Sequence, residues 1–143
     1  MISQTGEYAL RAAVYLAMSG DKPRTAKDIA DATQVPSFYV SKVMHSLVRA
    51  GVASSRRGLG GGFVLSRPKD QISVLDVLNS VDSAIQRITR CPLGIENHDQ
   101  LCPLHRLIDD AVHSTEKIFQ KTTLDQLVSG PGGIASLCGV DKK

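Results

Sequence analysis

The sequence has 143 residues, of which 42% are hydrophobic and 4% aromatic, and its formal net charge is +3 at pH 7. This length and composition suit one compact domain with an appendage and exclude a disordered chain. No apolar run is long enough to span a membrane, and the first residues contain no cationic leader with a small-residue cleavage site, so we expect a cytoplasmic protein without a membrane partner.

Charges and cysteines are unevenly distributed along the chain. Residues 1–69 contain ten Lys and Arg against four Asp and Glu, whereas residues 70–143 contain seven against ten. This asymmetry predicts a basic module that faces phosphates, joined to an acidic module with another task. All three cysteines and three of the four histidines lie in the second half. In a cytoplasmic protein such a cluster favours metal or redox chemistry over structural disulfides.

Two helices are predicted at the start of the chain. Residues 3–19 carry apolar side chains at helical spacing, among them Leu10, Ala13, Val14 and Ala17. Glu7 stands near the start of this helix, where its simplest interpretation is a carboxylate that interacts with the helix dipole. Residues 25–28 form a T-x-x-D start for the second helix, a variant of the capping box. Residues 33–36 are then expected to form a turn.

A third helix with one apolar and one polar face is predicted over residues 36–49. Apolar residues recur at helical spacing and predict an inward face: Val40, Val43, Met44, Leu47 and Val48. The opposite face carries polar side chains: Ser37, Ser41, Lys42, His45 and Arg49. We interpret this order of helix, turn and helix as an arrangement whose second helix enters a DNA major groove, about 12 Å wide.

A glycine-rich β-hairpin is predicted directly after this helix. Residues 52–54 form a strand that leads into Arg56-Arg57-Gly58-Leu59-Gly60-Gly61-Gly62, and residues 63–65 return. The glycines allow a sharp bend close to another molecule, and the arginines favour contact with phosphates and the minor groove. A nucleotide-binding loop is an alternative, but it needs a further glycine and a helix where residues 63–65 predict a strand. A plain hairpin without DNA contact is another alternative.

The second half of the chain predicts a loop followed by a long helix. An S-x-x-D start at Ser73 predicts a short helix that ends a DNA-binding domain over residues 1–83, and residues 84–100 form a cysteine-containing loop. Over residues 101–128 apolar residues step by three and four, the pattern of a coiled-coil seam: Leu101, Leu104, Ile108, Ala111, Thr115 and Ile118. Burial against its own core is the alternative to pairing with a copy. Residues 129–143 predict a flexible tail.

Two-fold pairing of this helix would have a consequence for the DNA site. It would place two recognition helices about 34 Å apart, one turn of double-stranded DNA. We therefore expect a homodimer that binds a near-palindromic operator.

The most specific pattern in the chain is Arg57-Gly58-x-Gly60-Gly61-Gly62-Phe63-x-Leu65. With it, residues 3–128 resemble the winged-helix transcriptional regulators of the Rrf type, the family of IscR, NsrR and CymR. The resemblance implies a mainly α fold with a small β-hairpin, in which a winged helix-turn-helix domain precedes a long C-terminal dimerisation helix. It also implies a homodimeric transcription factor, usually a repressor.

The resemblance places DNA contacts on particular residues. The family's wing arginine falls on Arg57, and its recognition-helix positions fall near Pro36, Phe38 and Ser41. This part of the chain differs from the glutamate-bearing pattern of IscR, so the operator sequence does not carry over. The complete predicted DNA-contact set is Ser37, Phe38, Ser41, Lys42, His45, Arg56, Arg57, Gly58, Gly60 and Gly61.

Cluster-binding members of the family carry three cysteines before the long helix, followed by a Leu-x-His-like element. This chain has the first and last as Cys91 and Cys102, keeps the element as Cys102-Pro-Leu-His105, and lacks the middle cysteine. Glu7 falls where NsrR-like proteins place an acidic residue that reaches the partner subunit's cluster. The resemblance therefore implies an iron-sulfur cluster, of the 2Fe-2S type, with Glu7, His98 or His105 completing the two cysteine ligands.

Two other interpretations of these residues remain open. Cys91, His98, Cys102 and His105 offer the ligand types of a tetrahedral zinc site, although their spacing matches no standard zinc finger. Alternatively, Cys91 and Cys102 form a thiol switch without a cluster. Cys138, on the predicted tail, is interpreted as a spare thiol or a resolving partner.

Enzymatic activity is not expected. The neighbouring carboxylates Asp109 and Asp110 point in different directions on a helix and are interpreted as solvated surface groups. His113 is predicted to face solvent. A nucleophile, a base and an orienting group do not occur together in the sequence. A protein-interaction module is the remaining class, which a failure of the basic half to bind any duplex at low salt would favour.

Overall fold

The computed structural model describes residues 2–81, 85–93 and 100–129. Its elements follow in the order α1 (Gln4–Met18), α2 (Ala26–Thr33), α3 (Ser37–Arg49), β1 (Ala53–Arg56), β2 (Gly62–Leu65), η1 (Lys69–Gln71), α4 (Val74–Ser80), α5 (Pro103–Lys121) and α6 (Leu124–Ser129). The described chain is therefore mainly helical with one antiparallel β-hairpin, as the sequence predicts. None of its helices has the length and apolarity needed to cross a membrane.

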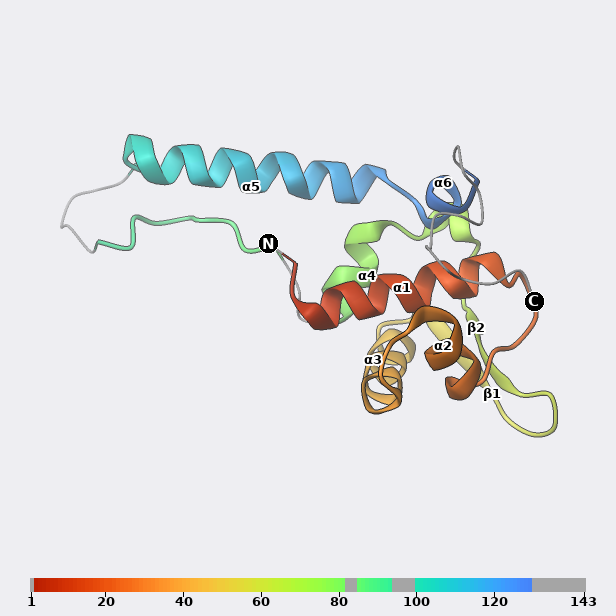
Figure 1. Cartoon of the computed structure of the whole chain (residues 1–143). Coiled ribbons are helices and arrows are strands. Elements are labelled where there is room, and N and C mark those ends of the chain that lie inside the picture. The colour runs from red at the N-terminus through yellow and green to blue at the C-terminus, as the bar shows by residue number, and fades with distance from the viewer. Residues whose placement is uncertain (1, 82–84, 94–99, 130–143) are drawn as a thin grey trace.

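Helix α1 lies at the centre of the predicted DNA-binding domain, between α2 and α3 on one side and α4 on the other (Figure 1). It begins where the Ser3 hydroxyl accepts a hydrogen bond from the Gly6 N–H at 3.0 Å, which satisfies one of the free donors of the first turn. Ala9 and Ala13 are fully buried. Their small side chains let the neighbouring helices approach closely, so the hydrophobic core forms around α1.

Helices α2 and α3 form the predicted helix-turn-helix. Thr25 and Asp28 make a complete capping box at the start of α2, with the Thr25 N–H donating to the Asp28 carboxylate at 2.9 Å. Gln34 takes a left-handed conformation with φ of 57° in the turn, and Pro36 precedes α3. The inward face of α3 is buried as predicted, whereas Val48 at its edge is only partly covered.

The hairpin extends from this body as a wing (Figure 1). Strands β1 and β2 pair in antiparallel register from Ala53 opposite Leu65 to Arg56 opposite Gly62. The turn between them uses φ values of 94° and 73° at Gly58 and Gly60, a region that L side chains rarely adopt. Residues 63–65 therefore form a strand, which excludes the nucleotide-loop alternative for this segment.

The return strand is also fixed to the segment before α2. Phe63 donates its N–H to the Arg24 carbonyl at 2.7 Å, and Arg24 donates back to the Phe63 carbonyl at 3.0 Å. This isolated bridge joins the base of the wing to the helix-turn-helix. The orientation of the wing relative to α3 is therefore set by backbone hydrogen bonds.

The long helix ends earlier than the sequence predicts, so that prediction is wrong at its C-terminal end. The sequence predicts one helix over residues 101–128, but α5 ends before Thr122 and the shorter α6 follows. The Val74 N–H donates to the Thr122 carbonyl at 2.9 Å, and the Leu124 N–H donates to the Ile72 carbonyl at 2.9 Å. Leu124 is fully buried. Because these contacts turn the chain back onto the domain, α6 is part of the core that surrounds α1.

Helix α5 runs along one side of the molecule and projects beyond the domain (Figure 1). None of the six predicted seam residues is buried, and Leu104 and Ile118 are each 61% exposed. A groove of about 340 Å³ on this side is lined almost entirely by apolar side chains: Ile85, Leu107, Ile108, Ala111, Val112 and Thr115. Within the described chain, the predicted seam of α5 is therefore not buried against the chain's own core.

Candidate DNA-binding surface and cysteine-histidine site

The polar face of α3 is open to solvent. Its predicted DNA-contact residues are all exposed: Ser37, Phe38, Ser41, Lys42 and His45. Phe38 differs from the other four because it is apolar, and at 79% exposure its side chain contributes little to the stability of the fold. It contacts Tyr39 edge to face with ring centroids 5.8 Å apart, and Tyr39 contacts Tyr8 in the same way at 5.2 Å. The aromatic contacts hold an apolar group at the start of the predicted recognition helix.

The tip of the wing presents cationic and apolar groups together. Arg56, Arg57, Gly58 and Gly60 are exposed, and Gly61 is partly covered. Leu59 at the tip is fully exposed. The sequence interpretation passed over Leu59, although an apolar residue between glycines of a predicted hairpin tip was a readable signal. Exposed guanidinium groups beside a glycine turn are able to follow a phosphate backbone or enter a narrow minor groove.

Three of the predicted metal ligands meet in one place. His105 Nδ1 lies 3.0 Å from Cys102 Sγ and 3.6 Å from Cys91 Sγ. The three donor atoms lie within 4.8 Å of one another, and each side chain is partly buried. Cys102 is the N-cap of α5 and His105 lies one turn further, so the helix fixes both side chains. Cys91 comes from the segment 85–93, which has neither helix nor strand.

The donor set fits a thiophilic metal centre. In a tetrahedral site with metal-ligand bonds of about 2.0 to 2.3 Å, neighbouring ligand atoms lie about 3.3 to 3.8 Å apart. The Cys91 to His105 distance of 3.6 Å agrees with that edge, and the Cys102 to His105 distance of 3.0 Å is shorter. Two thiols and one imidazole also match the mixed ligation of some 2Fe-2S centres. Three donors leave at least one ligand position for a residue from elsewhere.

The remaining predicted ligands are not part of this group. Glu7 is about half exposed in the first turn of α1, where its carboxylate accepts a hydrogen bond from Arg11 at 2.6 Å. Within one chain Glu7 is therefore occupied by an ion pair along its own helix, and a role at a partner subunit's site stays a prediction. His98 and Cys138 lie outside the described residues. The tail predicted over residues 129–143 lies outside them as well, apart from Ser129 in α6.

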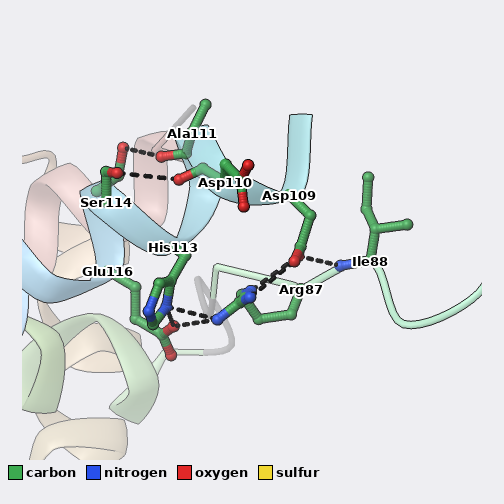
Figure 2. Close-up of polar contacts among 9 residues, drawn as sticks. Arg87, Ile88, Asp109, Asp110, Ala111, His113, Ser114 and Glu116 are labelled. Atoms are coloured by element: carbon green, nitrogen blue, oxygen red, sulfur yellow. Dashed lines mark hydrogen bonds and ion pairs between the residues drawn. The ribbon is translucent and has the colours of Figure 1, made fainter. Parts of the chain in front are cut away.

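A second polar cluster joins the segment 85–93 to α5, and sequence reasoning missed it. Arg87 donates two hydrogen bonds to the Asp109 carboxylate, from Nε at 2.8 Å and from Nη2 at 2.7 Å. The Ile88 N–H donates to the same carboxylate at 2.9 Å. Figure 2 shows the guanidinium between Asp109 and the side chains of His113 and Glu116. Asp109 is thus not the solvated surface group that we expected, and His113 is partly covered by Arg87.

The charge state of Asp109 follows from these contacts. The hydrogen bonds from Arg87 lower the pKa of Asp109 to about 2, against the opposing effect of its burial, and the Ile88 N–H lowers it further. The same partner raises the pKa of Arg87. Both groups are therefore charged at neutral pH. A carboxylate with 12% of its side chain exposed needs such a partner, because an unpaired buried charge is strongly unfavourable.

Comparison with known proteins gives a consistent picture over almost the whole chain. A sequence model of the Rrf2 family, described as an iron-dependent transcriptional regulator, matches residues 2–130. The transcriptional regulator IscR of Sodalis glossinidius is 30% identical over 90% of this chain and 78% of its own length. The regulator NsrR of Oceanobacillus iheyensis is 24% identical over 95% of both chains.

Solved structures agree with these matches. The structure of CymR, the global cysteine regulator of B. subtilis, is similar with a TM-score of 0.78 and 25% identity, and the match covers 90% of this chain and 96% of that one. The winged-helix architecture with a long C-terminal helix is therefore shared with a solved transcriptional regulator.

Proposed function

The chain belongs to the Rrf2 family of transcriptional regulators, and from this premise we propose a homodimeric DNA-binding repressor whose operator affinity responds to an iron-sulfur centre of the 2Fe-2S type. The observation that carries the proposal is the convergence of Cys91, Cys102 and His105 within 4.8 Å, beside the helix proposed to join the subunits. The protein is a regulator and not an enzyme, in keeping with its named relatives.

DNA binding uses α3 and the wing together. In the proposed complex α3 lies in the major groove with Ser37, Phe38, Ser41, Lys42 and His45 toward the bases and phosphates. Arg56 and Arg57 reach the flanking phosphates and the minor groove, where the glycine turn avoids steric conflict. The exposure of every one of these side chains supports the assignment. We place this activity in the cytoplasm, where bacterial DNA lies.

Dimerisation uses the apolar face of α5. Four of the six seam residues are exposed in one chain and none is buried, and water contact with side chains such as Leu104 and Ile118 is unfavourable. Pairing with the same face of a second copy removes this surface from water and satisfies the heptad-like spacing. The resulting two-fold axis places two α3 helices on one face of a near-palindromic operator, about 34 Å apart.

The residues of the site link ligand state to dimer geometry. Cys91 comes from the segment 85–93, whereas Cys102 and His105 belong to the start of α5. When bound, an iron-sulfur cluster supplies a redox-responsive bridge between such ligands. Ile85 of the same segment lines the apolar groove on α5. A change in how this segment packs therefore reaches the proposed dimer face, and a coupling of about 1 to 3 kcal/mol changes operator affinity roughly 5- to 150-fold.

The decisive test is visible absorption, with iron and acid-labile sulfide analysis, on protein purified without oxygen and without a metal-affinity tag. We expect a coloured protein with matched iron and sulfide that loses both in the Cys91→Ala and Cys102→Ala variants. The Ser55→Ala variant in the wing is the matched control and keeps its colour. A colourless protein that resists reconstitution would exclude the cluster and leave the DNA-binding assignment in place.

A second candidate is a zinc-containing or cluster-free regulator that responds to thiol oxidation. It is favoured by the same geometry, because a disulfide needs only the thiols of Cys91 and Cys102, and a zinc ion needs one further ligand beside these thiols and His105. Stoichiometric zinc without sulfide, or an intramolecular Cys91 to Cys102 bridge that changes operator affinity, would select it. Unchanged DNA binding by both cysteine variants under every redox condition would contradict either form of control.

A further inference from the structure

The segment 85–93 depends on side chains for its position. It forms no helix and no strand, so no ladder of backbone hydrogen bonds sets its register against α5. Arg87 and Ile88 supply directional contacts instead. Three hydrogen bonds reach the Asp109 carboxylate, and Arg87 also contacts His113 and Glu116 (Figure 2). A bidentate guanidinium-carboxylate pair fixes orientation as well as distance, which a single ammonium contact does not.

The spacing along both chains connects this pair to the cysteine-histidine site. Asp109 follows His105 by four residues, about 6 Å along a helix, and Arg87 precedes Cys91 by four residues. Four residues of extended chain reach at most about 14 Å, enough to cover one helical turn. A slip of one residue in the segment would move Cys91 by about 3.3 Å. Such a displacement is comparable to the whole 3.6 Å separation between Cys91 and His105.

The side chains around Arg87 and Asp109 support their ion pair on several sides. Asp109 is the one buried residue of α5 in the described chain, although it is a carboxylate on a helix whose other residues are exposed or partly buried. The far side of the Arg87 guanidinium lies 2.5 Å from His113 Nδ1 and 3.8 Å from Glu116. The adjacent Asp110 is exposed, and its carboxylate forms no hydrogen bond or ion pair with Arg87. The two carboxylates therefore offer a matched comparison.

We propose that Arg87 and Asp109 are positioning residues for the cysteine-histidine site. Their ion pair sets the register of the segment 85–93 along α5 and thereby holds the Cys91 thiol beside Cys102 and His105. The importance of this role rests on the proposed function, because it concerns the same site. The geometry of the thiol pair is a property of the metal-free chain, however, and it is measured without any cluster.

The experiment measures the effective concentration of the Cys91 and Cys102 thiols for each other. Full-length metal-free protein with Cys138→Ser is equilibrated in glutathione buffers of known ratio, and the intramolecular disulfide is quantified by mass spectrometry. We expect Arg87→Ala and Asp109→Asn each to lower the effective concentration about tenfold or more. In the double variant the second change adds little, because both remove the same contact.

Matched controls separate position from charge. Arg90→Ala removes the same charge from the residue next to Cys91, and Asp110→Asn removes a carboxylate beside Asp109. We expect both controls to stay within about twofold of the parent protein. An effective concentration unchanged by Arg87→Ala would overturn the proposal, and an equal loss in Arg90→Ala would do so too, since general electrostatics would then explain the result.

Two further measurements keep the outcome clear. Far-UV circular dichroism should be unchanged in Arg87→Ala, because Arg87 lies in a segment without helix or strand and outside the predicted winged-helix domain. Arg87→Lys keeps the positive charge but cannot donate two parallel hydrogen bonds to the carboxylate, so its effective concentration of thiols should lie between those of the parent and Arg87→Ala. This result is informative even if Asp109→Asn disturbs α5. Iron analysis can fail while the thiol result holds, and the reverse can also occur, so the two proposals are tested separately.

Discussion

At the scale of single residues, the two arginines of the wing differ in what supports them. Arg56 is the last residue of β1 and lies opposite Gly62, so the ladder restrains its backbone. Arg57 follows it in the turn and is exposed. A side chain at this position projects beyond the strand end and can enter a narrow minor groove, where the negative potential favours a guanidinium. Arg57 is therefore the wing residue with the largest expected effect on affinity.

We predict that Arg57→Ala weakens operator binding by about 1 to 3 kcal/mol. The slope of the logarithm of the binding constant against the logarithm of the salt concentration should become less steep by about 0.9, the value for one lost phosphate contact. Fluorescence anisotropy with an operator selected from a random library, at fixed salt, measures the first effect. Lys121→Ala at the end of α5 removes the same charge far from the wing and should bind like the parent. Indistinguishable titrations for Arg57→Ala and the parent would refute the contact.

At the scale of elements, local sequence determines where the helices of the DNA-binding domain begin. The boxes at Thr25 and Ser73 both form as predicted, because a hydroxyl and a carboxylate three residues apart satisfy free N–H groups at a helix start. The end of α5 follows a different rule. Apolar residues recur beyond Thr122, but the steps of the seam after Ile118 fall on Thr122 and Asp125. Leu124 gains more from burial beside Ile72 than from another exposed turn.

The cap of α2 gives a stability prediction at this scale. Thr25→Ala removes the hydroxyl that accepts the Asp28 N–H at 3.1 Å, so the free energy of unfolding should fall by about 1 kcal/mol. Thermal or urea unfolding measures the change. Ser46→Ala removes a hydroxyl that only donates back to the Lys42 carbonyl within α3 and should change the stability little. Equal losses in the two variants would show that the cap has no special role.

At the scale of the whole molecule, the described chain has an apolar face that its own fold leaves uncovered. We propose that a second copy covers the groove at Ala111 and the exposed side chains along α5, because two-fold symmetry brings the same face of both copies together. The segment 85–93 lies against the same helix, so the cysteine-histidine site borders the proposed interface. In the proposed dimer, the ligand state of the site alters the relative placement of the two DNA-binding domains.

The dimer prediction is tested by charge. Ala111→Asp places two carboxylates near the proposed two-fold axis, and like charges without water cost several kcal/mol, so we expect mainly monomer at micromolar concentration. Analytical ultracentrifugation measures the oligomeric state. Gln120→Asp adds the same charge nine residues further, about half a turn around the helix, and should remain a dimer. A dimer in both variants would place the interface elsewhere.

The sequence by itself determined the features whose cause is local. Helical spacing distinguished the buried face of α3 from its exposed face, and Gly58 and Gly60 indicated the wing because the turn needs positive φ values. The position of Cys91 could be inferred only by resemblance to a family.

Only the tertiary structure decided the contacts that close over long stretches of chain. Arg87 and Asp109 are 22 residues apart, and no period in the sequence relates a loop residue to a particular helix turn. Asp109 therefore looked like its exposed neighbour Asp110, although its partner makes it the buried anchor of the segment 85–93. The turn at Thr122 has the same origin, because the backbone groups that it pairs with lie just before α4 and at its first residue. Patterns specify faces, whereas the path of the folded chain decides which faces meet.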